Sequence, residues 1–255
     1  LLMKLENFLK KKFLYNEKKN FIKYLYYFYQ KISYKRNMKK SYSFGGIDLL
    51  INYLFKNKQK GIYIDIGCYH PFNGNNNFLL HQRGWSGINV DIDFNVIEMF
   101  NFIRPNDYNV QVAISDKSGE SNFFFYHNKS AINTLSKEVH DLRNNPSKEI
   151  RKIKTDTLSN IIEESPYKGQ KINFLSIDVE GYEMNVLKGF NLNKYKPDVI
   201  VIEYLDMSLK KLEFHNQKIE NIIKSDLFNM MKSHNYHLVN WLHSDLVFVS
   251  DNIRN

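Results

Sequence analysis

Short apolar runs alternate with segments of helical spacing along the chain after Gly61. The runs are rich in Ile and Val, as buried strands are, whereas the segments between them place apolar residues three or four positions apart, as amphipathic helices do. We therefore predict strands at 62–66, 87–91, 110–114, 122–126, 172–177 and 198–203, and helices at 47–55, 78–83, 95–102, 157–164, 183–187 and 218–231. Two last apolar runs, 236–241 and 246–250, are joined by a short turn and predict a hairpin.

This order of elements predicts the fold class. Strands that alternate with helices form a parallel sheet, because each crossover helix packs back on the sheet and covers one of its faces. A terminal hairpin adds an antiparallel strand to such a sheet. The sequence therefore predicts one α/β domain over residues 46–255, with a mostly parallel sheet and a C-terminal antiparallel hairpin.

A helical arm, residues 1–45, precedes this domain. Residues 5–32 show helical spacing, and their apolar stripe consists of Phe21, Leu25, Phe28 and Ile32. Of the 36 Lys and Arg residues, 12 lie in residues 1–40 beside only two of the 27 acids. The rest of the chain is nearly neutral, with 24 basic and 25 acidic residues, so the formal net charge of +9 belongs to the arm.

Three roles fit a basic, aromatic arm. A helix with large apolar residues favours a protein partner, so we first expect the stripe to pack on the domain or on a second copy of the chain. An anionic membrane surface comes second, because it attracts polybasic segments. Nucleic acid is the least favoured partner, since the basic excess is confined to residues 1–40 and does not extend over the domain.

Composition narrows the class of protein further. A hydrophobic content of 43% supports a packed core. The single cysteine, Cys68, excludes an internal disulfide framework, and no apolar run reaches the roughly 20 residues of a bilayer span. These features predict a cytoplasmic protein, peripheral to the inner membrane face where the arm binds lipid. Because Asn is abundant throughout the chain, we give the tract Asn75-Asn76-Asn77 no functional weight.

Acidic residues stand at the ends of most predicted strands, which is where an open parallel sheet binds its ligands. They are Asp65, Asp91, Asp178, Glu180 and Glu203. Carboxylates are rare in buried strands, so chance is a poor explanation for this pattern. Gly67 follows Asp65 closely and lets the backbone approach a ligand. Asp91 occupies the position from which an acid binds ribose hydroxyls in nucleoside-binding folds.

The loop after the first strand has neither a Gly-x-Gly-x-x-Gly pattern nor a Gly-x-x-x-x-Gly-Lys-Ser/Thr pattern. A dinucleotide and a nucleoside triphosphate are therefore disfavoured as ligands. An adenosine derivative with a positive centre and no phosphate fits the strand-end acids better. This chemistry is that of S-adenosylmethionine.

Several stretches resemble the FkbM-type S-adenosylmethionine-dependent methyltransferases, and together they cover about residues 60–205. They include Ile64-Asp-Ile-Gly-Cys-Tyr-His-Pro71, Gly84-Trp-Ser-Gly-Ile-Asn-Val-Asp91 and, as the most specific, Ile177-Asp-Val-Glu-Gly-Tyr-Glu-Met-Asn-Val-Leu-Lys-Gly189. The resemblance implies a class I methyltransferase fold, which is a Rossmann-like, mostly parallel sheet of seven strands. It also implies O-methylation of sugars, which many members of the family carry out.

The resemblance gives each matching residue a role. Those implied to bind S-adenosylmethionine are Asp65, Gly67, Cys68 and Tyr69 beside the methionine part, Asp91 at the ribose, Ile92, Ala113, Ile114 and Ser115 at the adenine, and also Asp178. Asp178, Glu180 and Glu203 are implied to face the methyl acceptor. His70 lies in the first loop, and we expect it to belong to the same catalytic site.

A hydroxyl group is a poor nucleophile, so its proton must leave as the new carbon–oxygen bond forms. A carboxylate base, a histidine, or a divalent metal that acidifies the hydroxyl meets this need. We expect Asp178 and Glu203 to act as the base or to bind Mg²⁺ or Mn²⁺ through oxygen, with Glu180 in support. The metal rests on analogy with sugar O-methyltransferases outside this family.

Plainer roles stay open for four of these residues. Asp65 could form an ion pair at a strand end, and Glu180 could favour the N-terminus of the following helix. Glu203 could be the buried partner of a lysine or arginine. His70 could bond to the backbone of its own loop.

The predicted function is S-adenosylmethionine-dependent O-methylation of a carbohydrate, on a nucleotide-linked or polymer-bound sugar in cell-surface glycan synthesis. One alternative is an RNA methyltransferase that captures its substrate with the basic arm. Another is a non-catalytic membrane or scaffold module that keeps the fold.

Overall fold

The computed structural model describes residues 24, 27–29, 31, 39–128, 130–143, 146–206 and 217–254. The chain divides into two compact units, Leu1–Lys40 and Ser41–Asn255. Phe21, Leu25 and Ile32 of the predicted stripe lie outside the described residues. The three roles considered for the arm, and its boundary with the domain, therefore stay predictions.

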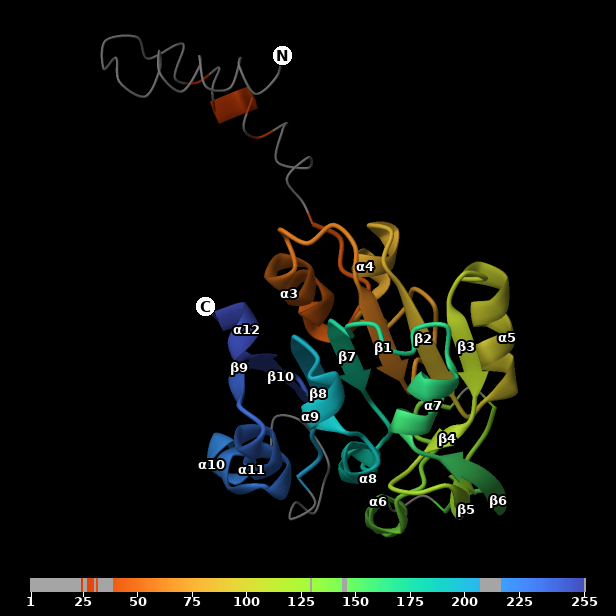
Figure 1. Cartoon of the computed structure of the whole chain (residues 1–255). Coiled ribbons are helices and arrows are strands. Elements are labelled where there is room, and N and C mark those ends of the chain that lie inside the picture. The colour runs from red at the N-terminus through yellow and green to blue at the C-terminus, as the bar shows by residue number, and fades with distance from the viewer. Residues whose placement is uncertain are drawn as a thin grey trace. The chain divides into compact units, whose positions relative to one another are not determined.

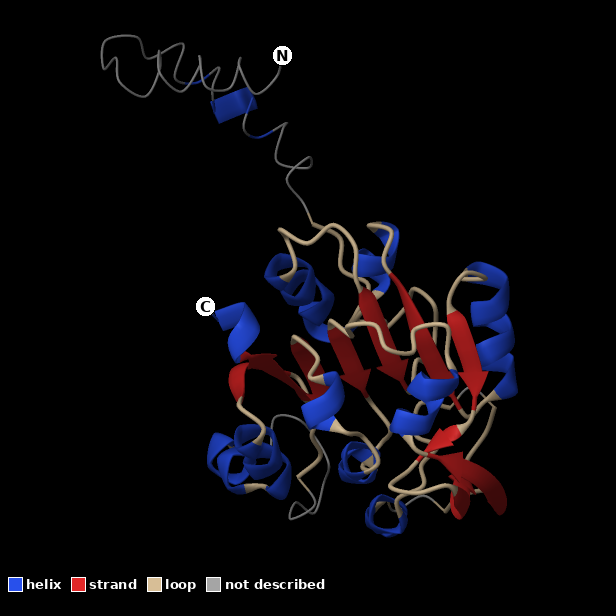
Figure 2. Cartoon of the chain, viewed as in Figure 1, coloured by secondary structure: helices blue, strands red, loops and turns tan. Residues whose placement is uncertain are grey.

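A seven-stranded sheet forms the centre of the second unit (Figures 1 and 2). Its strands are β1 (Ile62–Ile66), β2 (Ser86–Asp91), β3 (Tyr108–Gln111), β7 (Phe174–Ile177), β8 (Val199–Glu203), β9 (Tyr236–Leu242) and β10 (Asp245–Ser250). They lie in the order β3-β2-β1-β7-β8-β10-β9. The first five pair in parallel, and β10 runs antiparallel to both β8 and β9. The mostly parallel sheet with its terminal antiparallel hairpin confirms the predicted fold class.

A second sheet holds β4 (Ala113–Ile114), β5 (Gly119–Phe125) and β6 (Glu149–Asp156) in the order β4-β6-β5. The single strand predicted at 110–114 is therefore wrong. The chain leaves the large sheet after Gln111, and Ala113 pairs with Thr155 of the small one. The hydrophobic pattern does not predict β6, because charged residues occupy most positions of this strand. It is held by its pairing with β5, and most of its side chains are exposed.

Helices join the strands and cover both faces of the large sheet. They are α3 (Ile47–Leu54), α4 (Phe78–Gln82), α5 (Phe94–Ile103), α6 (Lys137–Leu142), α7 (Leu158–Glu164), α8 (Glu183–Lys188), α9 (Leu192–Tyr195), α10 (Ile219–Lys224), α11 (Asp226–Ser233) and α12 (Asp251–Arg254), with a short 3₁₀ turn, η2, at Phe44–Gly46. The one helix predicted at 218–231 is two helices. Ser225 is extended, and its Oγ accepts a hydrogen bond from the Phe228 amide at 3.1 Å, which starts α11.

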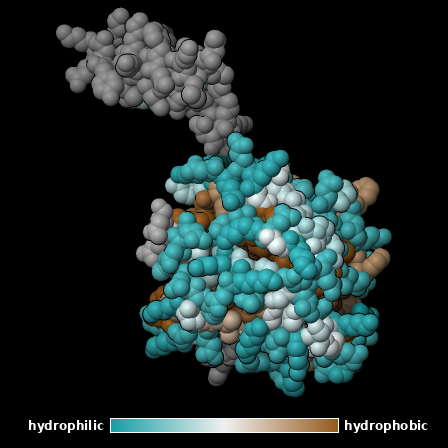
Figure 3. All heavy atoms as spheres, in the orientation of Figure 1, coloured by the Kyte–Doolittle hydropathy of each residue, from teal (hydrophilic) through white to brown (hydrophobic). Residues whose placement is uncertain are grey.

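Neighbouring residues of each strand pack into opposite layers, because side chains alternate across a sheet. One layer includes Ile64, Leu175 and Ile200 with Leu158 and Ile161 of α7. The other includes Tyr63, Phe174 and Val199 with Ile47 and Ile51 of α3. On the face shown in Figure 3, hydrophilic side chains cover most of the described surface, and hydrophobic ones show mainly between them. Among the described residues, no helix has the length and apolarity needed to cross a membrane.

Candidate active site

A cavity of about 430 Å³ lies at the carboxyl edge of the large sheet. Four strands end side by side there, because Ile66 pairs with Val90 and Ile177, and Ile177 pairs with Ile202. Small-molecule sites of open α/β sheets lie at this edge and commonly measure roughly 300–1,000 Å³. The predicted site residues that line the cavity are Gly67, Tyr69, Asp91, Ile92, Ala113, Ile114, Asp178, Glu180 and Glu203. Asp65, Cys68, His70 and Ser115 were also predicted, but they are not among its lining residues.

Gly67 begins the loop that follows β1. Its φ is 78°, and a Cβ on this residue would lie 1.8 Å from the carbonyl oxygen of Asp178. Its amide donates a hydrogen bond to the Val90 carbonyl at 2.9 Å. Only glycine meets both the left-handed conformation and the close approach to β7. The ends of β1, β2 and β7 are thereby held together under the cavity.

Asp91, at the end of β2, presents a carboxylate to the cavity. Its Oδ2 accepts a hydrogen bond from the Tyr69 amide at 3.1 Å, and its Oδ1 accepts one from the Asp93 amide at 2.9 Å. Burial raises the pKa of Asp91 to about 6, while these backbone donors oppose the rise. The carboxylate is therefore held in place by the backbone where it lines the cavity.

One wall of the cavity is apolar and is formed by Ile92, which follows β2, and by Val112, Ala113 and Ile114, which follow β3. Ser115 is buried behind this wall. Its Oγ donates to Asp116 and lies 3.3 Å from the hydroxyl of Tyr182, which does line the cavity. Ser115 therefore reaches the cavity only through Tyr182. Cys68 is buried against Val96, Ile97 and Phe100.

Asp65 supports the loop after β1 instead of lining the cavity. Its Oδ2 accepts hydrogen bonds from the side-chain amides of Asn75 at 3.1 Å and Asn77 at 2.8 Å. The buried Arg104 donates in turn to the amide oxygens of both asparagines. Burial raises the pKa of Asp65 to about 7, and Arg104 opposes that rise. The asparagine tract, given no weight above, is thus a buried structural network that only the structure reveals.

His70 also serves the loop. Its Nδ1 accepts hydrogen bonds from the amides of Phe72 at 3.2 Å and Asn73 at 3.1 Å, and its ring meets the Phe72 ring edge-on. These contacts agree with the plainer role, in which the histidine bonds to its own backbone. Its place outside the lining residues gives no support to a catalytic role.

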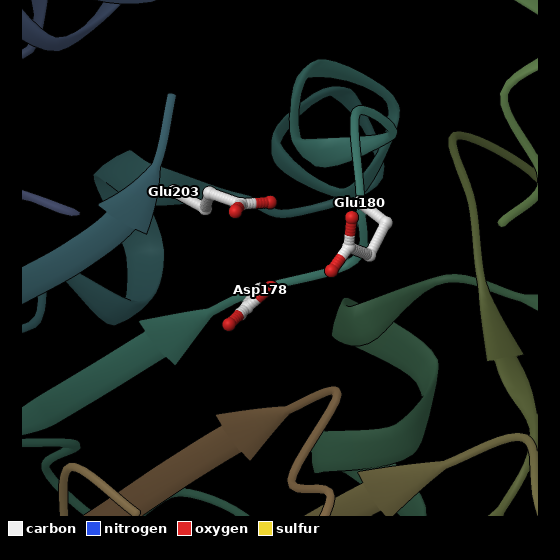
Figure 4. Close-up of side chains that lie close together, drawn as sticks. All are labelled: Asp178, Glu180 and Glu203. Atoms are coloured by element: carbon white, nitrogen blue, oxygen red, sulfur yellow. The ribbon is translucent and has the colours of Figure 1, made fainter. Parts of the chain in front are cut away.

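Three carboxylates meet at the other end of the cavity (Figure 4). Asp178 follows β7, Glu180 lies two residues further on, and Glu203 ends β8. One oxygen from each lies within 4.8 Å of the others. The Glu203 carboxylate points toward Glu180 in Figure 4. The parallel strand ends thus bring together acids that are distant in sequence.

Glu203 is the most constrained of the three. It is 8% exposed, and its Oε2 has no hydrogen-bond partner among the described residues. Burial and then Asp178 raise its pKa well above the usual range of a carboxyl group. Desolvation by the surrounding protein raises the pKa of Asp178, an exposed residue, to about 6. Burial raises the pKa of Asp245, which pairs with Glu203 across β8 and β10, to about 7. A buried oxygen without a partner costs stability, as functional sites often do.

Glu180 is placed by the segment that contains α6. It has a φ of 57° and forms an ion pair with Arg143, and its carbonyl accepts a hydrogen bond from Thr134 Oγ1 at 2.8 Å. Burial and Asp178 raise the pKa of Glu180 to about 8, while Arg143 opposes the rise. Glu183 takes the role considered for Glu180 at the helix start, because its Oε1 accepts the amides of Val179 and Gly181.

The sequence reasoning missed several lining residues. They are Phe44, Ser130, Ala131, Asn133 and Leu135, together with His243, Ser244 and Asp245 of the β9–β10 turn. None of them stands at the end of a predicted parallel strand, which was the signal used to find the others. The turn itself was predicted, but its position beside Glu203 depends on the antiparallel insertion of β10.

The fold and the cavity at its carboxyl edge define a class I methyltransferase domain. The family model described as "Methyltransferase FkbM domain" matches residues 65–238, which is more than half of the chain. The chain therefore belongs to the FkbM family of S-adenosylmethionine-dependent methyltransferases, and the family expected from the sequence motifs is confirmed.

Among solved structures, the chain is similar to a TehB-like SAM-dependent methyltransferase from Corynebacterium glutamicum. The two share 11% sequence identity with a TM-score of 0.40, over 88% of this chain and 96% of that chain. A likeness at this level says nothing about function. No curated protein matches the chain.

Proposed function

We propose that this chain transfers the methyl group of S-adenosylmethionine to a hydroxyl group of a carbohydrate, on a nucleotide-linked or polymer-bound sugar. Methyl transfer follows from the family, whereas the hydroxyl and the carbohydrate belong to the proposal. The observation that supports it is the buried Glu203 Oε2, which has no described partner and lies beside Asp178 in the cavity. A polar acceptor suits this pair, because its hydroxyl can form a hydrogen bond with Glu203 and give its proton to Asp178.

The lining residues fit S-adenosylmethionine. Gly67 leaves no room for a side chain between β1 and β7, so backbone faces the cavity there. Asp91 suits ribose hydroxyls, and the apolar wall of Ile92 and Ile114 suits an adenine ring. When bound, S-adenosylmethionine supplies a methyl group whose bond to sulfur breaks as the acceptor oxygen attacks. The lining carboxylates complement its positive charge.

Asp178, with Glu203 beside it, takes the proton of the acceptor hydroxyl. Because the pKa of Asp178 is raised only to about 6, this carboxyl group is mostly ionised at neutral pH and able to accept a proton. The pKa of Glu203 is raised further, so Glu203 keeps its proton more readily. Glu180, fixed by Arg143, supports the pair. The remaining rate acceleration comes from alignment of the acceptor oxygen with the methyl carbon.

A divalent cation is the second way in which the same oxygens meet this need. Asp178 and Glu203 would hold Mg²⁺ or Mn²⁺, with Glu180 as a third oxygen ligand. These ions prefer oxygen ligands, so the donor set fits them. A bound cation would lower the pKa of the acceptor hydroxyl.

The test is transfer of labelled methyl from S-adenosylmethionine to a panel of nucleotide sugars and cell-surface glycans. We expect Asp178→Asn to lower kcat by about 100-fold or more, because it removes the carboxylate that accepts the hydroxyl proton, while binding of S-adenosylmethionine in calorimetry shows that the variant is folded. The matched control is Glu164→Gln, which changes an exposed glutamate of α7 and leaves kcat unchanged.

Excess EDTA separates the two chemistries of this site. Full turnover in EDTA excludes the metal and leaves the carboxylate base, whereas loss of turnover that Mg²⁺ or Mn²⁺ restores supports the metal. Labelled RNA without any labelled glycan would overturn the carbohydrate substrate. Failure to bind S-adenosylmethionine in calorimetry would favour a non-catalytic module.

The location and the partners form part of the same proposal. We place the reaction in the cytoplasm, which suits a chain whose single cysteine, Cys68, is a buried free thiol. Contact of the basic residues 1–40 with a second subunit or with the inner membrane face stays a proposal. Gel filtration and vesicle flotation of the full chain test these contacts.

A further inference from the structure

One end of the cavity is built by residues outside the part of the chain that the family model matches. The model covers residues 65–238, yet Phe44 and the turn at 243–245 also line the cavity. These two flanks meet, because a Cβ on Gly45 would lie 3.4 Å from Leu242 Cγ and 3.9 Å from His243 Cβ. The residues expected to bind the cofactor lie inside the matched range. The flanks therefore shape the acceptor end, where Glu203 and Asp245 pair across β8 and β10.

Phe44 is an aromatic side chain held in place and yet left open. It lines the cavity with 65% of its surface exposed. The segment before it is fixed by donors to the buried Asp48 carboxylate, namely Ser41 Oγ at 2.6 Å, the Tyr42 amide at 2.7 Å and Ser43 Oγ at 2.9 Å. The ring also covers Gly74, where a Cβ would lie 2.5 Å from Phe44 Cε2. The Phe44 ring is thus held in a fixed position, and its exposed surface is open to a ligand.

This end of the cavity is lined by carboxyl groups. Four of its lining residues are acids, namely Asp178, Glu180, Glu203 and Asp245, and none of its described lining residues is Lys or Arg. A phosphate or carboxylate on the reacting ring would face the ionised Asp178, and the nearby Arg143 already forms an ion pair with Glu180. Hydroxyl groups, in contrast, donate well to carboxylate oxygens.

We propose that Phe44 is the stacking platform of an acceptor subsite for an uncharged sugar ring. A sugar ring has an apolar C–H face and a rim of hydroxyls, so Phe44 takes the face while Glu203 and Asp245 accept hydrogen bonds from the rim. Any phosphate of a nucleotide-linked sugar stays outside the cavity. This inference rests on the proposed function, and it assigns substrate recognition to the flanks of the domain.

The experiment measures methyl transfer by the full chain to methyl glycosides of neutral hexoses, and to the matching hexose 6-phosphates and uronates. With the best neutral glycoside, we expect Phe44→Ala to raise KM by about tenfold while kcat stays within about twofold. Phe44→Trp keeps KM near the wild-type value, because it preserves an aromatic face. The affinity for S-adenosylmethionine, measured by calorimetry, is unchanged in both variants and shows that they fold.

The matched control is Phe102→Ala, which removes a remote side chain with 88% of its surface exposed and leaves KM unchanged. An unchanged KM in Phe44→Ala would overturn the platform while leaving O-methylation of sugars intact. Preference for a hexose 6-phosphate or a uronate over the neutral glycoside would overturn the uncharged subsite. A wild-type chain that binds S-adenosylmethionine but labels no glycoside would instead overturn the proposed function itself, and this inference with it.

Discussion

The two ends of the cavity are built from different kinds of contact. The cofactor end is the part of the cavity around Gly67 and Asp91, where we propose that S-adenosylmethionine binds. Backbone hydrogen bonds hold it, from the Gly67 amide to the Val90 carbonyl and from the amides of Tyr69 and Asp93 to the Asp91 carboxylate. At the acceptor end, side chains converge from segments far apart in sequence. The first arrangement follows from one sheet and one motif, whereas the second depends on several independent placements.

The two ends also differ in whether their carboxylates have hydrogen-bond partners. The carboxylate of Asp91 accepts two hydrogen bonds, whereas Glu203 Oε2 has no partner among the described residues. An unsatisfied buried group costs about 1–3 kcal/mol, so the acceptor end loses stability that a ligand can restore. Substitutions at the cofactor end should therefore damage the fold, and those at the acceptor end should mainly change binding and turnover.

The largest expected effect is that of Gly67→Ala. The new Cβ would lie 1.8 Å from the Asp178 carbonyl oxygen, so the ends of β1 and β7 must move apart. We expect the free energy of unfolding to fall by about 4 kcal/mol or more, with loss of S-adenosylmethionine binding, in urea titrations and calorimetry. Gly84→Ala is the matched control, because Gly84 has a φ of 85° and no atom near the added Cβ. Equal effects of the two substitutions would contradict the close approach.

A smaller effect is expected for Asn77→Ala, which tests the network under the first loop. The Asn77 amide donates to Asp65 and accepts from Arg104, and all three residues are buried. Its loss leaves two buried charged groups with fewer partners, so urea unfolding should show a loss of about 2–3 kcal/mol. The exposed neighbour Asn73 supplies the control, since Asn73→Ala should change stability by less than about 0.5 kcal/mol. Indistinguishable unfolding curves would show that the network contributes nothing.

The smallest expected effect is a change in the pH dependence of stability. The pKa of Asp245 is raised to about 7 and that of Glu180 to about 8, whereas the unfolded chain has ordinary carboxyl pKa values. As the pH rises, the unfolded state loses these protons first, so stability falls between about pH 4 and pH 8. Glu203→Gln removes one such ionisation without removing a hydrogen bond from Oε2.

Urea unfolding of Glu203→Gln should therefore show a flatter pH profile and higher stability at pH 8 than the wild-type chain. The exposed Glu164→Gln serves again as control and should leave the profile unchanged. A steeper profile, or lower stability at pH 8, would show that the Glu203 carboxylate is compensated in the free protein.

The sequence predicted the parallel strands and the acids at their ends, because the hydrophobic period and strand-end polarity are local signals. The prediction from sequence failed where strand pairing between distant segments determines the structure. The residues 110–114 contribute to two sheets, and β6 is held by β5 although its own pattern is polar. In the sequence, Asp65 and His70 cannot be distinguished from the residues that line the cavity. In the structure, hydrogen bonds with their own loop determine their roles.

The sequence by itself determined the fold class and the family, and it predicted most of the strand-end residues that line the cavity. These rest on periodicity and on motifs whose members lie within one strand and its loop. Only the tertiary structure placed Phe44 in the same cavity as Glu203, paired Asp245 with Glu203 and left Glu203 Oε2 without a described partner. Such contacts depend on how β10 inserts beside β8 and how the segment before α3 folds back. Neither arrangement can be predicted from a local sequence pattern. The acceptor end is therefore a property of the folded domain, because its members are neighbours only in space.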